Sequence, residues 1–419
     1  MYAIIDCDNC FVSCERVFRP DLNGKPVVVL SNNDGCVVAR SNEAKQMGIK
    51  MGMPYYQLRQ QYTPEQVYAF SSNYELYAEM TARVMSIVTD ECPSFYRYSI
   101  DEAFCILDGF DRIDLKQWGE QLRQRILTST SMPVSIGIAP TKTLAKCAAY
   151  FAKRYAGYNH CAVIDSPDKR VKALQHYPID EVWGIGRRYA KQMTGHAILT
   201  AYDFTQRSRE WVKRTFTIGG ERTWRELQGD DCIPTEVPQP KQSICTSRSF
   251  PKNISSKTDI HSYIATFAAK CAEKLRAQHS VARKVTVFLE TNRFRTDLPQ
   301  YANSATVELL TPDNASQVIV ASATKALDIL FREGFEYKRA GVVVNEISED
   351  TAVQTNLFDY DSLLYSRRHK LDEVVDKINR LHGQETVALA SQGVFRKSVK
   401  RDLKSPDYTT MWSDIIQAN

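Results

Sequence analysis

The sequence predicts an α+β protein of several domains, and three observations support this class. Its 419 residues suffice for about three domains, and 43% hydrophobic with 25% charged residues is the composition of a globular protein. When the segment 20–70 is set aside, the first 140 residues show strand and helix patterns in the order strand, helix, strand, strand, helix, strand. That order is typical of the ferredoxin-like split βαβ fold.

Acidic residues stand at the ends of two of these predicted strands. The first strand, within residues 1–8, is a short apolar run that ends in Asp6, as a buried central strand does at its tip. An aromatic-rich hairpin is predicted over 94–107, and its turn carries Asp101 and Glu102. Adjacent carboxylates repel each other unless a cation lies between them, and hard carboxylate oxygens suit Mg²⁺. Three carboxylates on neighbouring strands can hold two metal ions about 3.5–4 Å apart, the arrangement used for phosphoryl transfer. A solvated acid pair at a turn is the ordinary alternative.

The remaining elements of this region follow from apolar spacing. The predicted helices cover 74–90, 115–126 and 143–154, and the predicted strand covers 133–139. The segment 20–70 reads as a small insertion, with two short strands around the turn at 32–35 and a helix capped by Ser41.

From about residue 168 the composition becomes more helical and more basic. Gly184 and Gly186 form a Gly-x-Gly turn before a helix that starts with Arg187 and Arg188. Such a turn exposes backbone N–H groups that can bind a phosphate. An ordinary glycine cap between two helices is the alternative, and the motif alone does not separate the two.

A second small α/β domain is predicted after a proline-rich linker at 233–241. Its elements are strands at 243–250, 284–289 and 340–344 and helices at 264–275 and 318–331. Arg248 and other basic residues of these strands are candidates for contacts to a phosphate backbone. Solvated charges at a strand edge are the alternative.

The chain is polar after residue 348. An apolar pair, Leu357 and Phe358, follows Gln354 in this segment, and such a pair can dock into a partner or pack on its own domain. A basic run at 396–404 is either a solvated tail or a nucleic-acid contact.

Charge and cysteine content narrow the class of protein. A net charge of +5 permits nucleic acid as a partner without requiring it. Eleven cysteines with irregular spacing favour a reducing cytoplasm and buried thiols over disulfides. Cys7, Cys10 and Cys14 lack a second ligand pair with zinc-site spacing. No apolar run is long enough for a bilayer, and Asp6 interrupts the N-terminal apolar segment, so neither a membrane segment nor a secretory signal is expected.

Taken in order, these motifs resemble the Y-family translesion DNA polymerases. The motifs that carry the resemblance are Asp6-x-Asp8 with Phe11 and Glu15, Ser99–Phe104, and Gly137–Ala139 followed by Lys142, Lys146 and Lys153. Residues 31–40 (SNNDGCVVAR) and 70–77 (FSSNYELY) narrow the resemblance to the UmuC subfamily, the catalytic subunits of bacterial DNA polymerase V and their plasmid-borne relatives. The similarity covers nearly the whole chain.

The resemblance implies a right-hand polymerase fold. The implied parts are a ferredoxin-like palm at 1–19 and 71–167, small fingers at 20–70, a helical thumb with a helix-hairpin-helix at 168–232, a linker at 233–241, an α/β little finger at 242–347, and a C-terminal extension at 348–419 with a clamp-binding peptide.

The resemblance also implies roles for individual residues. Asp6, Asp101 and Glu102 would be catalytic and would bind two Mg²⁺ ions, with the Cys7 carbonyl completing a site. Phe11 falls at the steric gate, whose ring blocks a 2′-hydroxyl. The implied nucleotide contacts are Phe11, Arg40, Lys45 and Lys153; the implied DNA contacts are Gly184, Gly186, Arg187, Arg188 and Arg248; the implied clamp contacts are Gln354, Leu357 and Phe358.

The sequence departs from the family pattern at a few positions. In many relatives a Tyr and an Arg of the fingers contact the phosphates, whereas Asn42 and Lys45 align there in this chain. Phe11 and Asp8 are closer to the DinB type than to UmuC.

The implied function is error-prone primer extension opposite damaged template in the SOS response, in the cytoplasm. The implied partners are primer–template DNA, a deoxynucleoside triphosphate, a processed UmuD′ dimer, a RecA nucleoprotein filament and the β sliding clamp.

Two alternative functions would use the same residues differently. A nucleotide cyclase could use a two-metal palm, although it needs no duplex groove. A DNA- and clamp-bound adaptor without activity would not need the carboxylate trio.

Overall fold

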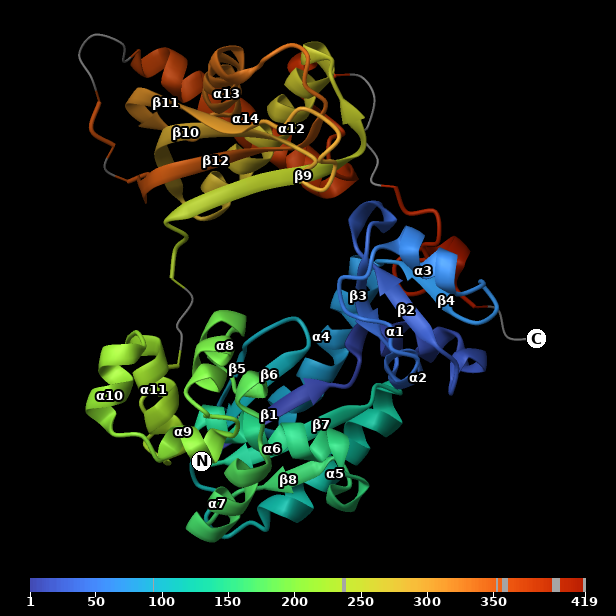
Figure 1. Ribbon diagram of the computed structural model, residues 1–419. Helices are drawn as coiled ribbons and strands as arrows, with labels where there is room; N and C mark the ends of the chain where they lie inside the picture. Colours follow the sequence, from blue (N-terminus) through green and yellow to red (C-terminus); the bar gives the residue numbers. More distant parts are fainter. Residues whose placement is uncertain (93, 236–238, 352, 356–360, 394–399, 417–419) are drawn as a thin grey trace. The chain divides into compact units, whose positions relative to one another are not determined.

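The computed structural model describes residues 1–92, 94–235, 239–351, 353–355, 361–393 and 400–416. The chain divides into two compact units, Met1–Glu236 with Arg401–Asn419, and Val237–Lys400 (Figure 1). The first unit combines mixed sheets with helices and the second an antiparallel sheet with helices, so the predicted α+β class is confirmed. No helix in the described part of the chain has the length and apolar character needed to cross a membrane.

A five-stranded sheet with the order β5-β6-β1-β7-β8 lies at the centre of the first unit. Its strands are β1 (Tyr2–Cys7), β5 (Phe95–Arg97), β6 (Glu102–Ile106), β7 (Val134–Ala139) and β8 (Cys161–Val163). Strand β1 pairs antiparallel with both β6 and β7. Apart from β8 at one edge, this is the split βαβ topology that the element order predicted.

Helices cover both faces of this sheet. They are α1 (Cys10–Phe18), α4 (Tyr74–Glu91), α5 (Leu115–Thr130) and α6 (Lys142–Arg154). Alternation along β1 divides the core, because Ala3 and Ile5 join the cluster that contains α4 and α5, whereas Ile4 joins the cluster that contains α6. Asp6 has the same parity as Ile4, and therefore points to the α6 side.

The segment 20–70 forms a separate three-stranded sheet with the order β3-β2-β4. Its elements are β2 (Val27–Leu30), β3 (Val37–Arg40), β4 (Tyr68–Ser71), α2 (Asn42–Gln46) and α3 (Tyr55–Gln61). Ser41 caps α2 as predicted, since its hydroxyl accepts a hydrogen bond from the Ala44 amide at 3.2 Å. The sequence analysis did not predict β4 and α3.

Five short helices complete the first unit. They are α7 (Pro167–His176), α8 (Arg187–Gly195), α9 (Ala201–Thr205), α10 (Arg209–Thr215) and α11 (Ile218–Leu227). The buried Glu226 of α11 ties them to α6, because its carbonyl accepts from the Thr141 hydroxyl at 2.9 Å and its carboxylate accepts from the Thr143 amide at 3.0 Å.

The second unit contains a four-stranded antiparallel sheet with the order β11-β10-β12-β9. Its elements are β9 (Ser243–Ile254), α12 (Lys257–Ala277), β10 (Ser280–Thr291), β11 (Ala302–Asp313), α13 (Ser316–Leu330), β12 (Tyr337–Glu349) and α14 (Ser362–His382). The predicted strands and helices of this segment are present, with β11 and α14 in addition. Arg276 of α12 holds α14 through Asp376 at 2.7 Å.

The C-terminal segment 401–416 returns to the first unit and lies beside β4 (red in Figure 1). Arg401 pairs with Glu75 at 3.4 Å and Lys404 pairs with Asp407 at 2.7 Å. The described part of the basic run is therefore docked on the fold. The rest of the run lies outside the described residues, and the alternatives of a solvated tail and a nucleic-acid contact stay predictions.

Close packing of α6 on β7 depends on Gly137. A Cβ atom at this position would lie 2.2 Å from both the Ala145 carbonyl oxygen and the Ala149 nitrogen. We expect Gly137→Ala to lower the free energy of unfolding by about 3 kcal/mol, because the helix backbone must move. Gly157→Ala is the matched control, since no atom lies within 4 Å of its added methyl group. Urea unfolding midpoints measure both, and equal midpoints would contradict the packing argument.

Burial gives Glu15 of α1 an unusual titration. Its side chain is fully buried, and the carboxyl accepts hydrogen bonds from the Tyr77 hydroxyl at 2.6 Å and the Ser405 hydroxyl at 3.1 Å. Burial raises the pKa of Glu15 from 4.5 to about 7, and these two hydrogen bonds oppose the rise. The folded chain therefore retains a proton that the unfolded chain has already released between these pH values.

We expect stability to fall between pH 4.5 and 7 because of this group, by about 3 kcal/mol in all. The contribution is fully present below pH 4.5 and is lost as the pH rises to about 7. Glu15→Gln cannot titrate, so its stability relative to the parent should increase over the same range. Urea unfolding of both chains at several pH values tests this, and a difference that does not change with pH would refute it.

Candidate active site

The pairing of β1 with β6 brings the predicted acidic residues to one place. Asp6 lies directly opposite Glu102 in the antiparallel register. Asp101 precedes β6, and its carbonyl accepts a hydrogen bond from the Cys7 amide at 3.0 Å. The prediction that the first strand lies beside the hairpin is thus confirmed.

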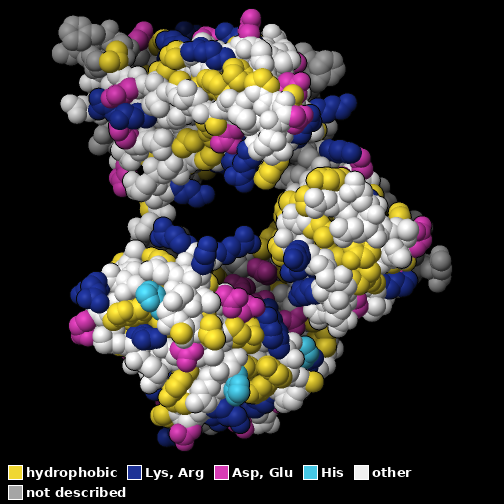
Figure 2. Space-filling view, in the orientation of Figure 1, with side chains coloured by type: hydrophobic (Ala, Val, Ile, Leu, Met, Phe, Trp, Pro, Cys, Tyr) yellow, Lys and Arg dark blue, Asp and Glu magenta, His cyan; other side chains and the backbone are white. Residues whose placement is uncertain are grey.

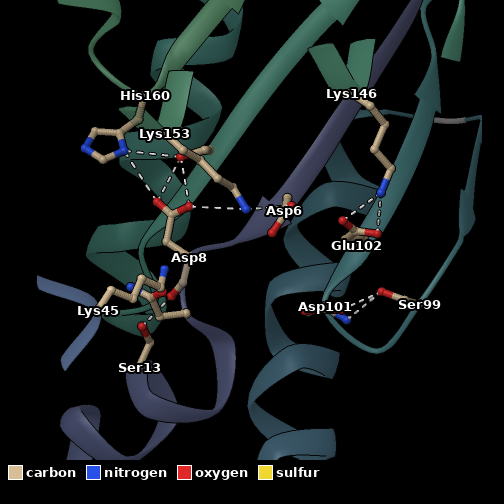
Figure 3. A network of polar contacts seen from close by, with 12 residues as sticks. Asp6, Asp8, Ser13, Lys45, Ser99, Asp101, Glu102, Lys146, Lys153 and His160 are labelled. Atoms are coloured by element: carbon tan, nitrogen blue, oxygen red, sulfur yellow. Dashed lines mark hydrogen bonds and ion pairs between the residues drawn. The ribbon is translucent and has the colours of Figure 1, made fainter. Parts of the chain in front are cut away.

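Two lysines of α6 neutralise the facing carboxylates (Figure 3). Lys153 Nζ lies 2.6 Å from Asp6 Oδ2, and Lys146 Nζ lies 2.7 Å from Glu102 Oε2. The lysines are seven residues apart, two helical turns, so they project from one face of α6. The sequence analysis noted Lys146 without giving it a role, although this spacing was the signal that could have paired it with an acid.

Asp101 and Asp8 have different partners. The Ser99 hydroxyl donates to Asp101 Oδ1 at 2.5 Å. Asp8 accepts from the Ser135 hydroxyl at 2.9 Å, lies 3.4 Å from His160 Nδ1, and is 3.7 Å from Lys153 Nζ. Figure 3 shows that the Asp8 carboxylate points toward His160. Asp8 thus shares Lys153 with Asp6 but takes its hydrogen bond from Ser135.

The surroundings of the ion pair shift the pKa values of both Asp6 and Lys153. Burial raises the pKa of Asp6 to about 7; Lys153 opposes this rise, and the neighbouring Glu102 carboxylate adds to it. Burial would lower the pKa of Lys153, but Asp6 and Asp8 outweigh it and the pKa is raised. The carboxylate is therefore held in a position where a positive charge close by is strongly favourable.

A cavity of about 320 Å³ is lined by the residues predicted to bind metal ions and the nucleotide. Its lining is Asp6, Cys7, Asn9, Cys10, Phe11, Val38, Ala39, Arg40, Lys45, Met51, Asp101, Glu102 and Lys153. All eight residues predicted to bind metal or nucleotide are present in this set. Phe11 is held by aromatic contacts, stacked on Tyr77 with centroids 4.6 Å apart and edge-on to Tyr74 at 5.7 Å.

The wall contributed by the segment 20–70 is cationic. Lys45 donates to Asn9 Oδ1 at 2.6 Å, and burial lowers its pKa together with the charges of Arg40 and Lys153. Arg40 donates to the Ile49 carbonyl at 2.6 Å, while its buried Nε has no hydrogen-bond partner among the described residues. Figure 2 shows acidic side chains bordered by Lys and Arg side chains on this face of the first unit. Such mutually repelling cations favour an incoming polyanion.

The donor chemistry of the cavity suits a hard divalent cation. Three carboxylates and the Cys7 carbonyl offer oxygen ligands, and the facing pair Asp6 and Glu102 requires a compensating positive charge. In this structure, Lys146 and Lys153 supply that charge. Within the described ranges no three Asp, Glu, His or Cys side chains are already grouped as a ligand set. Binding therefore requires side-chain rotations that release Lys146 and Lys153.

The predicted DNA contacts of the helical segment lie at the start of α8. Gly186 is the N-cap of this helix, and Arg187 and Arg188 are exposed in its first turn. Gly184 has φ +90°, and a Cβ there would lie 2.4 Å from Thr223 Oγ1, so the turn requires glycine. These residues are not part of the cavity lining.

Arg248 lies on β9, and its contact to DNA stays a prediction. It has the strand parity of the buried Ile244 and Phe250, and it pairs in register with the buried Ala340. Arg248 thus lies on the helix-covered face, where its charge acts on Tyr263 of α12, and not on the open face of the sheet. The open face carries Lys284, one of the basic strand residues that the sequence analysis considered, and Arg339, which it did not select.

The predicted clamp peptide is only partly described. Gln354 is exposed. Leu357 and Phe358 lie outside the described residues.

Comparison with family models and known proteins is consistent with this architecture. Residues 5–150 match the model of the impB/mucB/samB family, residues 241–357 match that family's C-terminal domain, and residues 369–418 match a domain of unknown function (DUF4113). The chain is 41% identical to Protein UmuC of Salmonella typhimurium over 100% of both chains. It is 40% identical to Protein SamB of the same species over 100% of this chain and 99% of the relative.

More distant matches extend to other polymerases. A DNA polymerase IV from Desulfatibacillum aliphaticivorans is 26% identical over 92% of this chain and 95% of the relative. A solved Y-family DNA polymerase chimera of Dbh and Dpo4 has a TM-score of 0.64 at 23% identity, covering 83% of this chain and 100% of its own. That structural likeness supports the predicted multidomain polymerase fold.

The full-length identity to UmuC and SamB, together with the two family models, sets aside the nucleotide cyclase alternative. The chain belongs to the impB/mucB/samB family and is a Y-family DNA polymerase of the UmuC type.

Proposed function

We propose that the chain is an error-prone translesion polymerase subunit that adds deoxynucleotides to a primer opposite damaged template in the SOS response. The observation that carries the proposal is a single cavity with two kinds of wall. Asp6, Asp101 and Glu102 form its acidic side, and Arg40 and Lys45 form its basic side. A nucleotidyl transferase needs this combination, because it must hold both metal ions and a triphosphate.

Two Mg²⁺ ions would be held by Asp6, Asp101, Glu102 and the Cys7 carbonyl. When bound, they would lower the pKa of the primer 3′-hydroxyl and stabilise the charge on the departing pyrophosphate. The residues of the chain would supply positioning. Lys153, displaced from Asp6, would remain within reach of the triphosphate together with Arg40 and Lys45.

Phe11 is proposed as the steric gate. Its ring lines the cavity, and stacking on Tyr77 restricts its rotation. A rigid aromatic wall excludes a substituent by shape alone, and the 2′-hydroxyl is the group by which a ribonucleotide differs.

The roles proposed for the parts of the chain are those of the family. Residues 1–19 and 71–167 would act as the palm, 20–70 as the fingers, 168–232 as the thumb and 242–347 as the little finger. The proposed fingers have a core of their own built on a three-stranded sheet. A part of only about 50 residues makes a small lid, which agrees with tolerance of distorted templates and low fidelity.

The proposed partners come from the same resemblance. They are primer–template DNA, a UmuD′-like dimer, a RecA filament and the β clamp, which would be contacted through Gln354, Leu357 and Phe358. A cytoplasmic location is part of the proposal, and eleven free cysteines agree with a reducing compartment.

The metal assignment makes a sharp prediction for Asp101. We expect Asp101→Ala to reduce primer extension at least 100-fold, since even the loss of groups that support metal ligands costs about 10–100-fold. Binding to primer–template duplex should persist. Asp108→Ala, on an exposed residue just after β6, is the matched control and should extend normally. Primer extension and duplex-binding assays measure both properties, and full extension by the Asp101 variant would refute the assignment.

The gate assignment predicts a change in sugar selectivity. We expect Phe11→Ala to raise ribonucleotide incorporation at least about tenfold relative to deoxynucleotide incorporation, because a shape restriction of this kind is worth about 10–200-fold. Phe110→Ala removes a comparable ring that packs edge-on to Trp118 outside the cavity, and serves as the control. Single-nucleotide kinetics with both sugars give the ratio. An unchanged ratio in the Phe11 variant would place the gate elsewhere.

A further inference from the structure

Three consecutive polar side chains, from the last residue of β4 to the N-cap of α4, are fully buried. Ser71, Ser72 and Asn73 have no exposed surface, and they belong to the 70–77 motif that narrowed the family resemblance. The proposed mechanism uses none of them. Buried polar groups are kept where partners satisfy them, so the partners of Ser71 and Asn73 indicate what this part of the motif does.

Residues 401–416, here called the strap, supply most of these partners. The Ser71 amide donates to the Leu403 carbonyl at 3.0 Å, and the Leu403 amide donates back to the Ser71 hydroxyl oxygen at 2.9 Å. The carboxylate of Asp34 accepts from the Ser71 hydroxyl at 2.6 Å and from the Asp402 amide at 3.1 Å. The strap thereby adds a parallel bridge to the edge strand β4.

Asn73 fastens the next residues of the strap to the start of α4. Its Oδ1 caps the helix by accepting from the Leu76 amide at 3.4 Å. Its Nδ2 donates to the Ser405 hydroxyl oxygen at 3.1 Å and to the Pro406 carbonyl at 3.3 Å. One buried amide therefore joins the helix that carries Tyr74 and Tyr77 to the strap.

A chain of direct contacts runs from the strap to the cavity. The Ser405 hydroxyl donates to Glu15 Oε1 at 3.1 Å, and the Tyr77 hydroxyl donates to the same oxygen at 2.6 Å. The Tyr77 ring then stacks on Phe11 with an interplanar angle of 15°. Phe11 lines the cavity.

We propose that the strap is a positioning element of the active site, in which Ser405 fixes the plane of the Phe11 ring through Glu15 and Tyr77 and so strengthens discrimination against ribonucleotides. This inference rests on the proposed role of Phe11 as the gate. It assigns a function to the last part of the segment that matches a domain of unknown function. Without the Ser405 hydroxyl, Glu15 retains one described partner, and the Tyr77 ring loses a restraint on its orientation.

The test measures sugar selectivity in the full chain. The quantity is the ratio of kcat/KM for a deoxynucleotide to that for the matching ribonucleotide. We expect Ser405→Ala to lower this ratio about five- to tenfold, mainly through faster ribonucleotide use, as for the loss of one ordinary hydrogen bond. Ser413→Ala is the matched control, because Ser413 is an exposed strap residue bonded only locally to Asp414 among the described contacts, and its ratio should equal that of the parent.

Parallel measurements on Phe11→Ala separate the two proposals. If Phe11→Ala loses selectivity and Ser405→Ala does not, the strap inference fails while the gate stands. If Phe11→Ala keeps selectivity, the gate itself fails, and the inference fails with it. In the double variant, Ser405→Ala should add no further loss; an additive loss would show that Ser405 acts by another route and would overturn the inference.

Two further measurements distinguish positioning from a general structural effect. Glu15→Gln keeps an acceptor at Oε1, so its ratio should stay within about twofold of the parent, whereas Glu15→Ala should fall as Ser405→Ala does. Hydrogen exchange tests the docking without any activity assay. The amides of Ser71, Asp402 and Leu403 should be protected in the parent, and exchange of the strap at the rate of an unstructured peptide would overturn the proposal.

Discussion

The antiparallel pairing of β1 with β6 is the constraint on which the candidate site depends. It sets Asp6 directly opposite Glu102, and like charges opposed on neighbouring strands are destabilising. Both side chains face α6, whose Lys146 and Lys153 offset the repulsion. The close approach of α6 depends in turn on Gly137, which has no side chain to hold the helix away. Fold stability and site chemistry are therefore linked through the same three elements.

The charged side chains of the cavity can exchange their present partners for a bound ligand. Asp6 and Glu102 are paired with flexible lysines, which a divalent cation can displace. Arg40 and Lys45 have no carboxylate partner among the described contacts and hydrogen-bond only neutral oxygens. A metal–triphosphate complex carries both charges in one ligand, so its binding would satisfy the acidic and the basic side together. Net charge alone could not reveal this, because +5 over 419 residues says nothing of local separation.

The strap covers an exposed edge of the small three-stranded sheet. Strand β4 is an edge of a small sheet, and an edge strand with unpaired backbone groups needs a cover. The strap covers it, inserts Leu403 against the core of the 20–70 segment, and stacks Tyr408 on Phe18 at 4.6 Å. The buried side chains of Ser71 and Asn73 then find partners 332 positions away in the sequence.

Local pattern in the sequence was sufficient to determine the order of strands and helices in the split βαβ core, the placement of acids at strand ends, and the motif order that indicates the family. These features depend on periodicity and turn chemistry within a few residues, which are written into the chain directly. Tertiary structure alone decided that Lys146 meets Glu102, that Arg248 faces the helices, and that Ser405 bonds Glu15 across 390 positions. Such contacts depend on which distant elements pair and in which register, and a one-residue change of register reverses every side chain.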